Sequence, residues 1–207
     1  RRGMAKAKSD IILRDRLQFT LTPDGDISLV YGRIDLSDYV NVIEKKGLLV
    51  KDLFLQIRDP NNGSGEVANT GVWSVLFNDM QNPAPGQDTQ SAWKIFVSSR
   101  AYESAKDVGI ASPDVLHIEE YVISRYSGTS QGELTEGYFR GNYPMRDYHP
   151  GGYPVVSDLL VGIAVDAAAT DSEYDSATLE VDVMLIAEPT SITQKQMTQL
   201  LTQAQDL

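Results

Sequence analysis

The chain has 207 residues, of which 42% are apolar and 23% charged, and it contains no cysteine. A chain of this length buries roughly 70% of the surface that its unfolded form exposes, so one globular domain folds without a disulfide or a metal ion. The lack of thiols excludes a CxxC redox site, a thiolate zinc site and a cysteine nucleophile. No segment reaches the ~18 to 20 apolar residues that cross a bilayer and no signal peptide is recognisable, so we expect a soluble protein without a transmembrane segment.

The net charge of −11 is unevenly distributed along the chain. Residues 1–16 carry six basic and two acidic side chains, whereas the rest of the chain carries 12 basic and 27 acidic ones. We therefore expect a basic N-terminal arm over residues 1–16 that contacts nucleic acid or an anionic membrane while the acidic body stays repelled. A solvated tail without a partner is the alternative. The basic residues of the arm are Arg1, Arg2, Lys6, Lys8, Arg14 and Arg16.

Alternation of apolar and polar residues is the dominant pattern, and it predicts β-strands. Turn chemistry separates the strands, as at Pro23-Asp24-Gly25 and in the predicted loop Asp59–Gly63. The pattern predicts an all-β, antiparallel, eight-stranded β-sandwich over residues 17–189. The expected strands are Leu17–Thr22, Ile27–Tyr31, Leu48–Arg58, Val72–Phe77, Trp93–Val97, Val115–Tyr126, Leu159–Val165 and Leu179–Ala187.

A helical tail is expected over residues 190–207. Pro189 ends the last strand, and the hydroxyl residues that follow it can cap a first helical turn. Apolar residues recur at helical spacing at Met197, Leu200, Leu201 and Ala204. Such a narrow apolar stripe favours packing on the chain's own domain or on a neighbour. A second, short helix is expected near residues 99–106.

The segment Ser127–Val156 is expected to be one long loop, rich in glycine, tyrosine and proline. Tyrosine and arginine are enriched in buried protein interfaces, and aromatic rings also form sugar-stacking surfaces. The alternative is that these rings only pack the loop onto the sandwich. The candidate interface residues of the loop are Tyr138, Phe139, Arg140, Tyr143, Tyr148 and Tyr153.

Residues that could carry chemistry are few. His117 and Glu119 share one face of a strand and could pair, but a metal site needs three or four ligands, so a hydrogen-bonded surface histidine is the simpler interpretation. His149 is interpreted as a loop histidine. Oxygen ligands for a loosely bound calcium ion could come from an acidic loop, but its spacing is not that of an EF-hand and a solvated loop is the simpler interpretation; its members are Asp166, Asp171, Glu173 and Asp175. No nucleophile or nucleotide motif is present. We expect that the protein is not an enzyme and that it has no catalytic or metal-binding residue, no cofactor and no small-molecule substrate.

The plan of the chain resembles the single jelly-roll coat proteins of icosahedral viruses. Residues 1–16 correspond to the arm, 17–187 to the sandwich and 192–207 to the terminal helix. The resemblance implies two four-stranded sheets, a location in the virion, and lattice contacts of loops and termini with copies of the chain, with or without a second capsid protein. It implies an arm that faces the genome or an inner membrane. Here the arm is short and weakly charged, so a lipid-facing or scaffolding arm is as credible as genome binding.

Two other functions stay open at this point. A carbohydrate-binding β-sandwich would use the tyrosine-rich loop 138–153. A metal-dependent β-sandwich enzyme would use His117 or His149.

Overall fold

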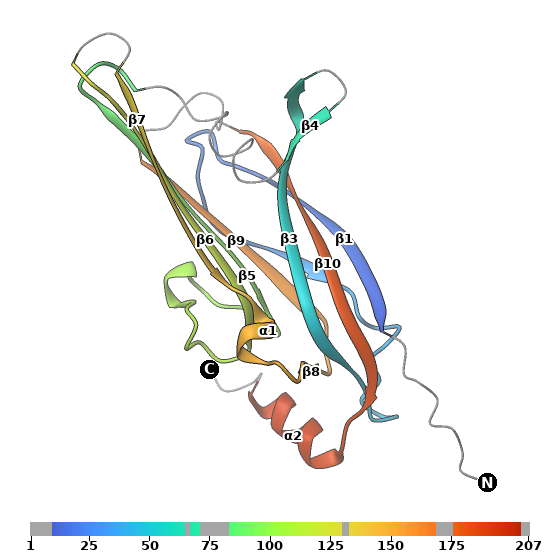
Figure 1. Ribbon diagram of the computed structural model, residues 1–207. Helices are drawn as coiled ribbons and strands as arrows, with labels where there is room; N and C mark the ends of the chain where they lie inside the picture. Colours follow the sequence, from blue (N-terminus) through green and yellow to red (C-terminus); the bar gives the residue numbers. More distant parts are fainter. Residues whose placement is uncertain (1–9, 65–66, 71–82, 130–132, 169–175, 204–207) are drawn as a thin grey trace.

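The computed structural model describes residues 10–64, 67–70, 83–129, 133–168 and 176–203, which form two antiparallel sheets packed face to face (Figure 1). One sheet contains β1 (Ile11–Thr20), β10 (Thr178–Ser191) and β3 (Lys46–Ser64), with β4 (Val67–Thr70) and β8 (Tyr153–Val155) both paired to β3. The other contains, in order, β2 (Ile27–Ile34), β9 (Leu159–Ala168), β5 (Asp88–Ser98), β6 (Val115–Ser127) and β7 (Leu134–Tyr143). The helical elements are η2 (Ala105–Asp107), α1 (Met145–Tyr148) and α2 (Gln194–Gln203).

The strand pairing is nested. β1 pairs with β10, β2 with β9, β3 with β8, and β5 with β6, each pair antiparallel. A chain paired in this way is one long hairpin rolled into two facing sheets, which is the jelly-roll arrangement. The expected antiparallel sandwich with a short C-terminal helix is therefore confirmed, and β4 and β7 are additions to the eight-stranded roll.

The core lies between the sheets because the inward positions of both are apolar. Along β10 buried and partly buried residues alternate, with Leu179, Val181, Val183 and Leu185 all at most 3% exposed. Trp93 of β5 is the largest fully buried side chain of the facing sheet.

A smaller apolar cluster lies on the outer face of β5 and β6, around Phe96, Tyr102 and Ile118. Phe96 stands opposite Gly162 of β9, and a Cβ atom at Gly162 would overlap the phenylalanine ring. Glycine is thus required at this position by close approach, since the far end of the Phe96 ring occupies the space that a side chain would need.

Three parts of the expected layout differ from the structure. The described residues form ten strands, not eight; β4, β7 and β8 were not expected, and the expected strand Val72–Phe77 lies outside the described residues. The expected loop Asp59–Gly63 is instead the end of β3, where the register with β4 shifts. The short helix expected near residues 99–106 is reduced to the single turn η2.

Candidate assembly surface

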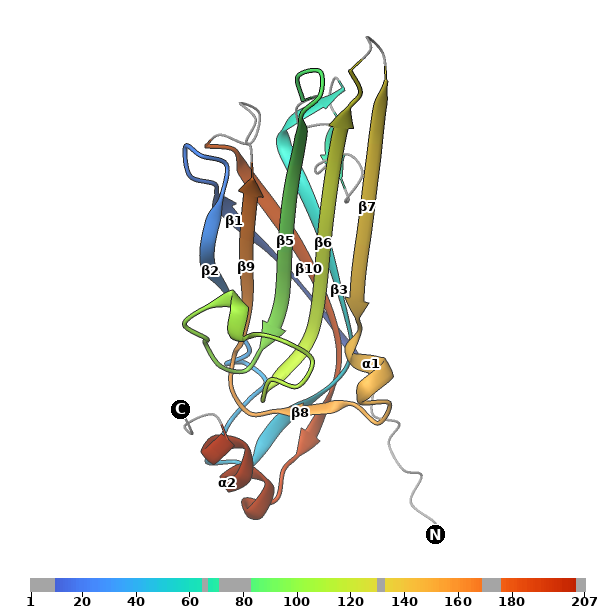
Figure 2. The same cartoon turned by 90° about the vertical axis from the view of Figure 1, so that its left-hand side faces the viewer.

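The segment expected to be one long loop contains β7, the edge strand of its sheet (Figure 2). Within the described residues β7 pairs with β6 alone, in register from Ile118 opposite Tyr143 to Ser127 opposite Leu134. Seven of its ten residues are exposed. Edge strands of soluble proteins commonly carry lysine, proline, a bulge or inward-pointing charges that block pairing with another chain. β7 has no lysine, no proline and an unbroken register, and its charges are one acidic and one basic residue, Glu136 and Arg140.

Alternation places the side chains of β7 on two faces. Tyr138 and Arg140 stand opposite Ile123 and Tyr121 of β6, so they share the face that looks toward the other sheet. Phe139 points to the outer face. Both rings are exposed, Tyr138 to 47% and Phe139 to 57%. Because they lie on opposite faces of the strand, the two adjacent aromatic residues form no common stacking surface.

The inward face of β6 and β7 holds a polar cluster. The Tyr121 hydroxyl donates a hydrogen bond to the buried carboxylate of Glu119, and His117 Nε2 lies 3.1 Å from the other carboxylate oxygen. The Arg140 guanidinium lies 3.5 Å from Glu119 and 5.6 Å from the centre of the Tyr121 ring. Burial raises the pKa of Tyr138, against the opposing effect of the Arg140 charge. His117 and Glu119 do share a face, as expected, but His117 is buried and is not a surface histidine.

Phe139 borders a groove on the outer face of the same sheet, with a volume of about 800 Å³. Lys94 lies in this groove and donates to the carbonyl oxygens of Ala105 and Val108, at 3.0 and 2.8 Å, while pairing with Glu120 at 3.2 Å. The groove therefore combines one exposed aromatic ring with charged side chains.

The remaining aromatic residues of the expected loop lie elsewhere. Tyr143 packs against the outer cluster at the end of β7. Tyr148, in α1, is 51% exposed. Tyr153 packs against the main core, and its hydroxyl donates to Asp114 Oδ1 at 3.2 Å. Burial, helped by the Asp114 carboxylate, raises the pKa of Tyr153 to about 12. Only part of the set is therefore positioned for contact with a partner.

The C-terminal helix packs on its own domain. Met197 is 1% exposed and clusters with Ile192 and Val156, while Leu200 packs at the margin. Thr193 and Gln196 cap the first turn reciprocally, with Gln196 N donating to Thr193 Oγ1 at 3.3 Å. Met197 is thus unavailable to a neighbouring subunit; the side chain of Leu201 lies outside the described part.

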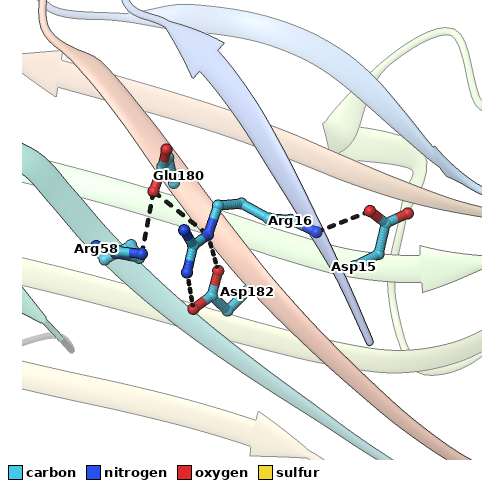
Figure 3. A network of polar contacts seen from close by, with 5 residues as sticks. All are labelled: Asp15, Arg16, Arg58, Glu180 and Asp182. Atoms are coloured by element: carbon cyan, nitrogen blue, oxygen red, sulfur yellow. Dashed lines mark hydrogen bonds and ion pairs between the residues drawn. The ribbon is translucent and has the colours of Figure 1, made fainter. Parts of the chain in front are cut away.

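The residues expected in the basic arm divide into two groups. Arg14 and Arg16 lie in β1, so the boundary expected at residue 16 falls inside the first strand. Figure 3 shows Arg16 held by acidic neighbours: its guanidinium bonds both oxygens of Asp182, at 2.6 and 3.0 Å, and lies 3.5 Å from Glu180, which also pairs with Arg58. The hydrogen bond from Arg16 holds the pKa of Asp182 below its usual range.

The other basic residues, Arg1, Arg2, Lys6 and Lys8, lie outside the described residues, as do Asp171, Glu173 and Asp175 of the acidic loop. Among the described residues no three histidine or acidic side chains are grouped closely enough to hold a metal ion. None of the described helices is long and apolar enough to span a membrane.

Fold and surface together define a jelly-roll sandwich with an exposed aromatic edge strand. No protein-family model matches the chain, and no curated protein is similar to it in sequence. A solved structure of Desmodium yellow mottle tymovirus is similar at 10% identity and a TM-score of 0.30, over 92% of this chain and 94% of that one. The tailspike protein of Acinetobacter baumannii phage AM24 is similar at 11% identity and a TM-score of 0.18, over 88% of this chain and 27% of that one. Neither likeness is close enough to carry an argument.

Proposed function

We propose that this chain is a structural, self-assembling coat protein of an icosahedral virus shell. The observation that carries the proposal is the ten-residue edge strand β7, on which Tyr138 and Phe139 are exposed and which has no lysine, proline or bulge. β7 carries one acidic and one basic residue and so has no net charge of its own; an aromatic, uncharged-on-balance edge on a chain of net charge −11 favours a protein partner over free solution. The fold supports the proposal by analogy, since jelly-roll domains form viral capsids.

The test is the size of the purified full chain. We expect defined oligomers or regular particles in light scattering after size exclusion and in electron micrographs. Phe139→Ser should reduce assembly, whereas Ile110→Ser, which removes a side chain that is 64% exposed away from β7, should not. A chain that forms nothing larger than a dimer at any concentration would refute the proposal.

The basic arm belongs to the same proposal. Residues 1–9 carry four basic and no acidic side chains, and they would contact the packaged nucleic acid or an inner membrane. Four phosphate contacts to single-stranded nucleic acid predict a slope of about −3 in log affinity against log salt concentration. Binding to anionic vesicles without binding to nucleic acid would instead assign the arm to a membrane.

A second candidate function is carbohydrate binding, favoured by the groove that Phe139 borders. The Phe139 ring can stack on a sugar, and the Glu120 carboxylate beside it can accept hydrogen bonds from sugar hydroxyl groups. A glycan screen tests this, with Phe139→Ala expected to abolish binding and Tyr143→Ala to leave it unchanged. A monomer that binds glycans would favour this function over the shell.

A further inference from the structure

The sequence of β7 is complementary to itself when read in the opposite direction. Glu136 and Arg140 lie two residues on either side of Tyr138, on the same face of the strand. Gly137 and Phe139 flank Tyr138 on the other face. Antiparallel pairing about a two-fold axis places residues at equal distances from the axis opposite each other. With the axis at Tyr138, a second copy of this strand can therefore place Arg140 opposite Glu136 and, at the same time, Phe139 opposite Gly137.

The geometry points to a two-fold contact between β7 of one copy and β7 of a second copy, centred on Tyr138, that joins the two five-stranded sheets into one continuous sheet. This inference rests on the proposed self-assembly and names its interface. In this register Tyr138 faces Tyr138, and each Glu136 faces an Arg140 of the second copy. Each Phe139 faces Gly137, and the pairing extends from residue 134 to residue 142.

Charge selects this register over its neighbours. A contact centred on Glu136 would oppose two glutamates, and one centred on Arg140 would oppose two arginines; like charges directly opposite are destabilising. Contacts centred on Gly137 or Phe139 leave both charges opposite neutral residues. Only the register centred on Tyr138 forms two salt bridges.

The charged residues keep their own-chain contacts in this arrangement. Glu136 accepts from Arg125 Nε at 2.9 Å, and Arg140 lies 3.5 Å from Glu119. A carboxylate has two oxygens and a guanidinium several N–H donors, so each can hold a second partner across the interface. Both stay partly exposed, with 31% of the Glu136 side chain and 44% of the Arg140 side chain accessible.

The pairing of phenylalanine with glycine already occurs inside the subunit. Phe96 lies over Gly162 across β5 and β9, where the missing side chain makes room for the ring. Phe139 opposite Gly137 of the second copy repeats that arrangement, and a ring over an edge glycine is a known way to stabilise a strand pair.

A cysteine at the centre of the register tests the contact directly, because the chain has no cysteine of its own. Directly opposed residues of an antiparallel pair have Cα atoms about 4.5 to 5.5 Å apart, within disulfide range. We expect Tyr138→Cys in the full chain to form a disulfide-linked dimer under mild oxidation. In Thr135→Cys, which replaces an exposed β7 residue, the two thiols lie six residues apart along the paired strands, or roughly 20 Å, so this matched control should not cross-link. Equal cross-linking of both variants, or none, would overturn the register.

Charge reversal gives a second, independent test. Glu136→Arg alone and Arg140→Glu alone each create two like-charge contacts and should weaken association by about tenfold. Mixed together, the two variants should form heterodimers, since every charge then meets its opposite. If the single variants fail to fold by circular dichroism, the cysteine test still decides. Failure of two folded variants to associate on mixing would overturn the inference.

The outcomes for the interface and for the shell are separable. Regular particles without a 138–138 cross-link would leave the proposed shell standing and refute this contact. A cross-linked dimer that never forms larger particles would support the contact and refute the shell.

Discussion

Replacing Met197 by alanine tests whether α2 is an integral part of its own subunit. Met197 is 1% exposed, and methionine-to-alanine changes at such sites cost about 2 to 5 kcal/mol. The cluster with Ile192 and Val156 is small and lies at one end of the sandwich, so the site can relax and we expect the lower limit, about 2 kcal/mol. For a chain of this size that loss lowers the melting temperature by roughly 4 to 8 °C.

The measurement is thermal unfolding by circular dichroism at a fixed protein concentration, together with hydrogen exchange of the α2 amides. The matched control is Gln199→Ala, which changes an exposed residue of the same helix and should leave the melting temperature within about 1 °C. An unchanged melting temperature for Met197→Ala, with α2 amides exchanging as fast as in an unfolded chain, would show that the helix does not dock on its own domain. The tail would then be free to contact a neighbour.

Three further predictions concern the stability of the sandwich. Arg16 lowers the pKa of Asp182 in the folded chain. The ionised carboxylate therefore stabilises the fold at pH values above the pKa that Asp182 has in the unfolded chain, and this stabilisation is lost as the pH falls through its lower pKa in the folded chain. Asp182→Asn should flatten the acid limb of a plot of unfolding free energy against pH. The pKa of Tyr153 is raised to about 12, so stability should fall as pH rises from about 10 to 12, and Tyr153→Phe should remove that fall. Gly162→Ala should cost about 1 to 3 kcal/mol in chemical denaturation, because the new methyl group overlaps Phe96.

Each of these predictions has a result that would contradict it. An acid limb that is unchanged in Asp182→Asn, or an alkaline limb unchanged in Tyr153→Phe, would place the titrating group elsewhere. The control for the glycine is Gly151→Ala, where no atom lies within 4 Å of the added methyl group. Equal stability losses at Gly162 and Gly151 would mean that backbone freedom, not the phenylalanine ring, determines the effect.

The sequence predicted those strands whose burial differs between their two faces. Leu179, Val181 and Val183 alternate because one face of β10 meets the core, and a period of two is then visible in the sequence. β7 was missed because both of its faces are largely exposed, so no apolar period exists to be read. β8 was missed because it has three residues and contains Pro154.

The candidate surface was predicted in composition but not in geometry. The aromatic residues were recognised, yet Tyr138 and Phe139 are adjacent in a strand and therefore point to opposite faces. Helical spacing identified Met197 as an apolar contact, but spacing cannot say whether the partner is the same chain or another. Arg16 was assigned to a free arm because its partners in β10, Glu180 and Asp182, are distant in sequence.

The nested pairing of the strands also sets the order in which parts of the protein become available during synthesis. Arg16 and its partner Asp182 are 166 residues apart, so β1 lacks its hydrogen-bonded strand partner, β10, until the ribosome has synthesised the last strand. The meander β5–β6–β7 needs only local contacts and is complete much earlier. In a nascent chain the edge strand β7 is thus exposed before β1 and β10 can pair. On polysomes, incomplete neighbouring chains can therefore associate through β7. Slow translation of the segment after β7 should therefore increase premature association, and a chaperone that covers this edge should prevent it.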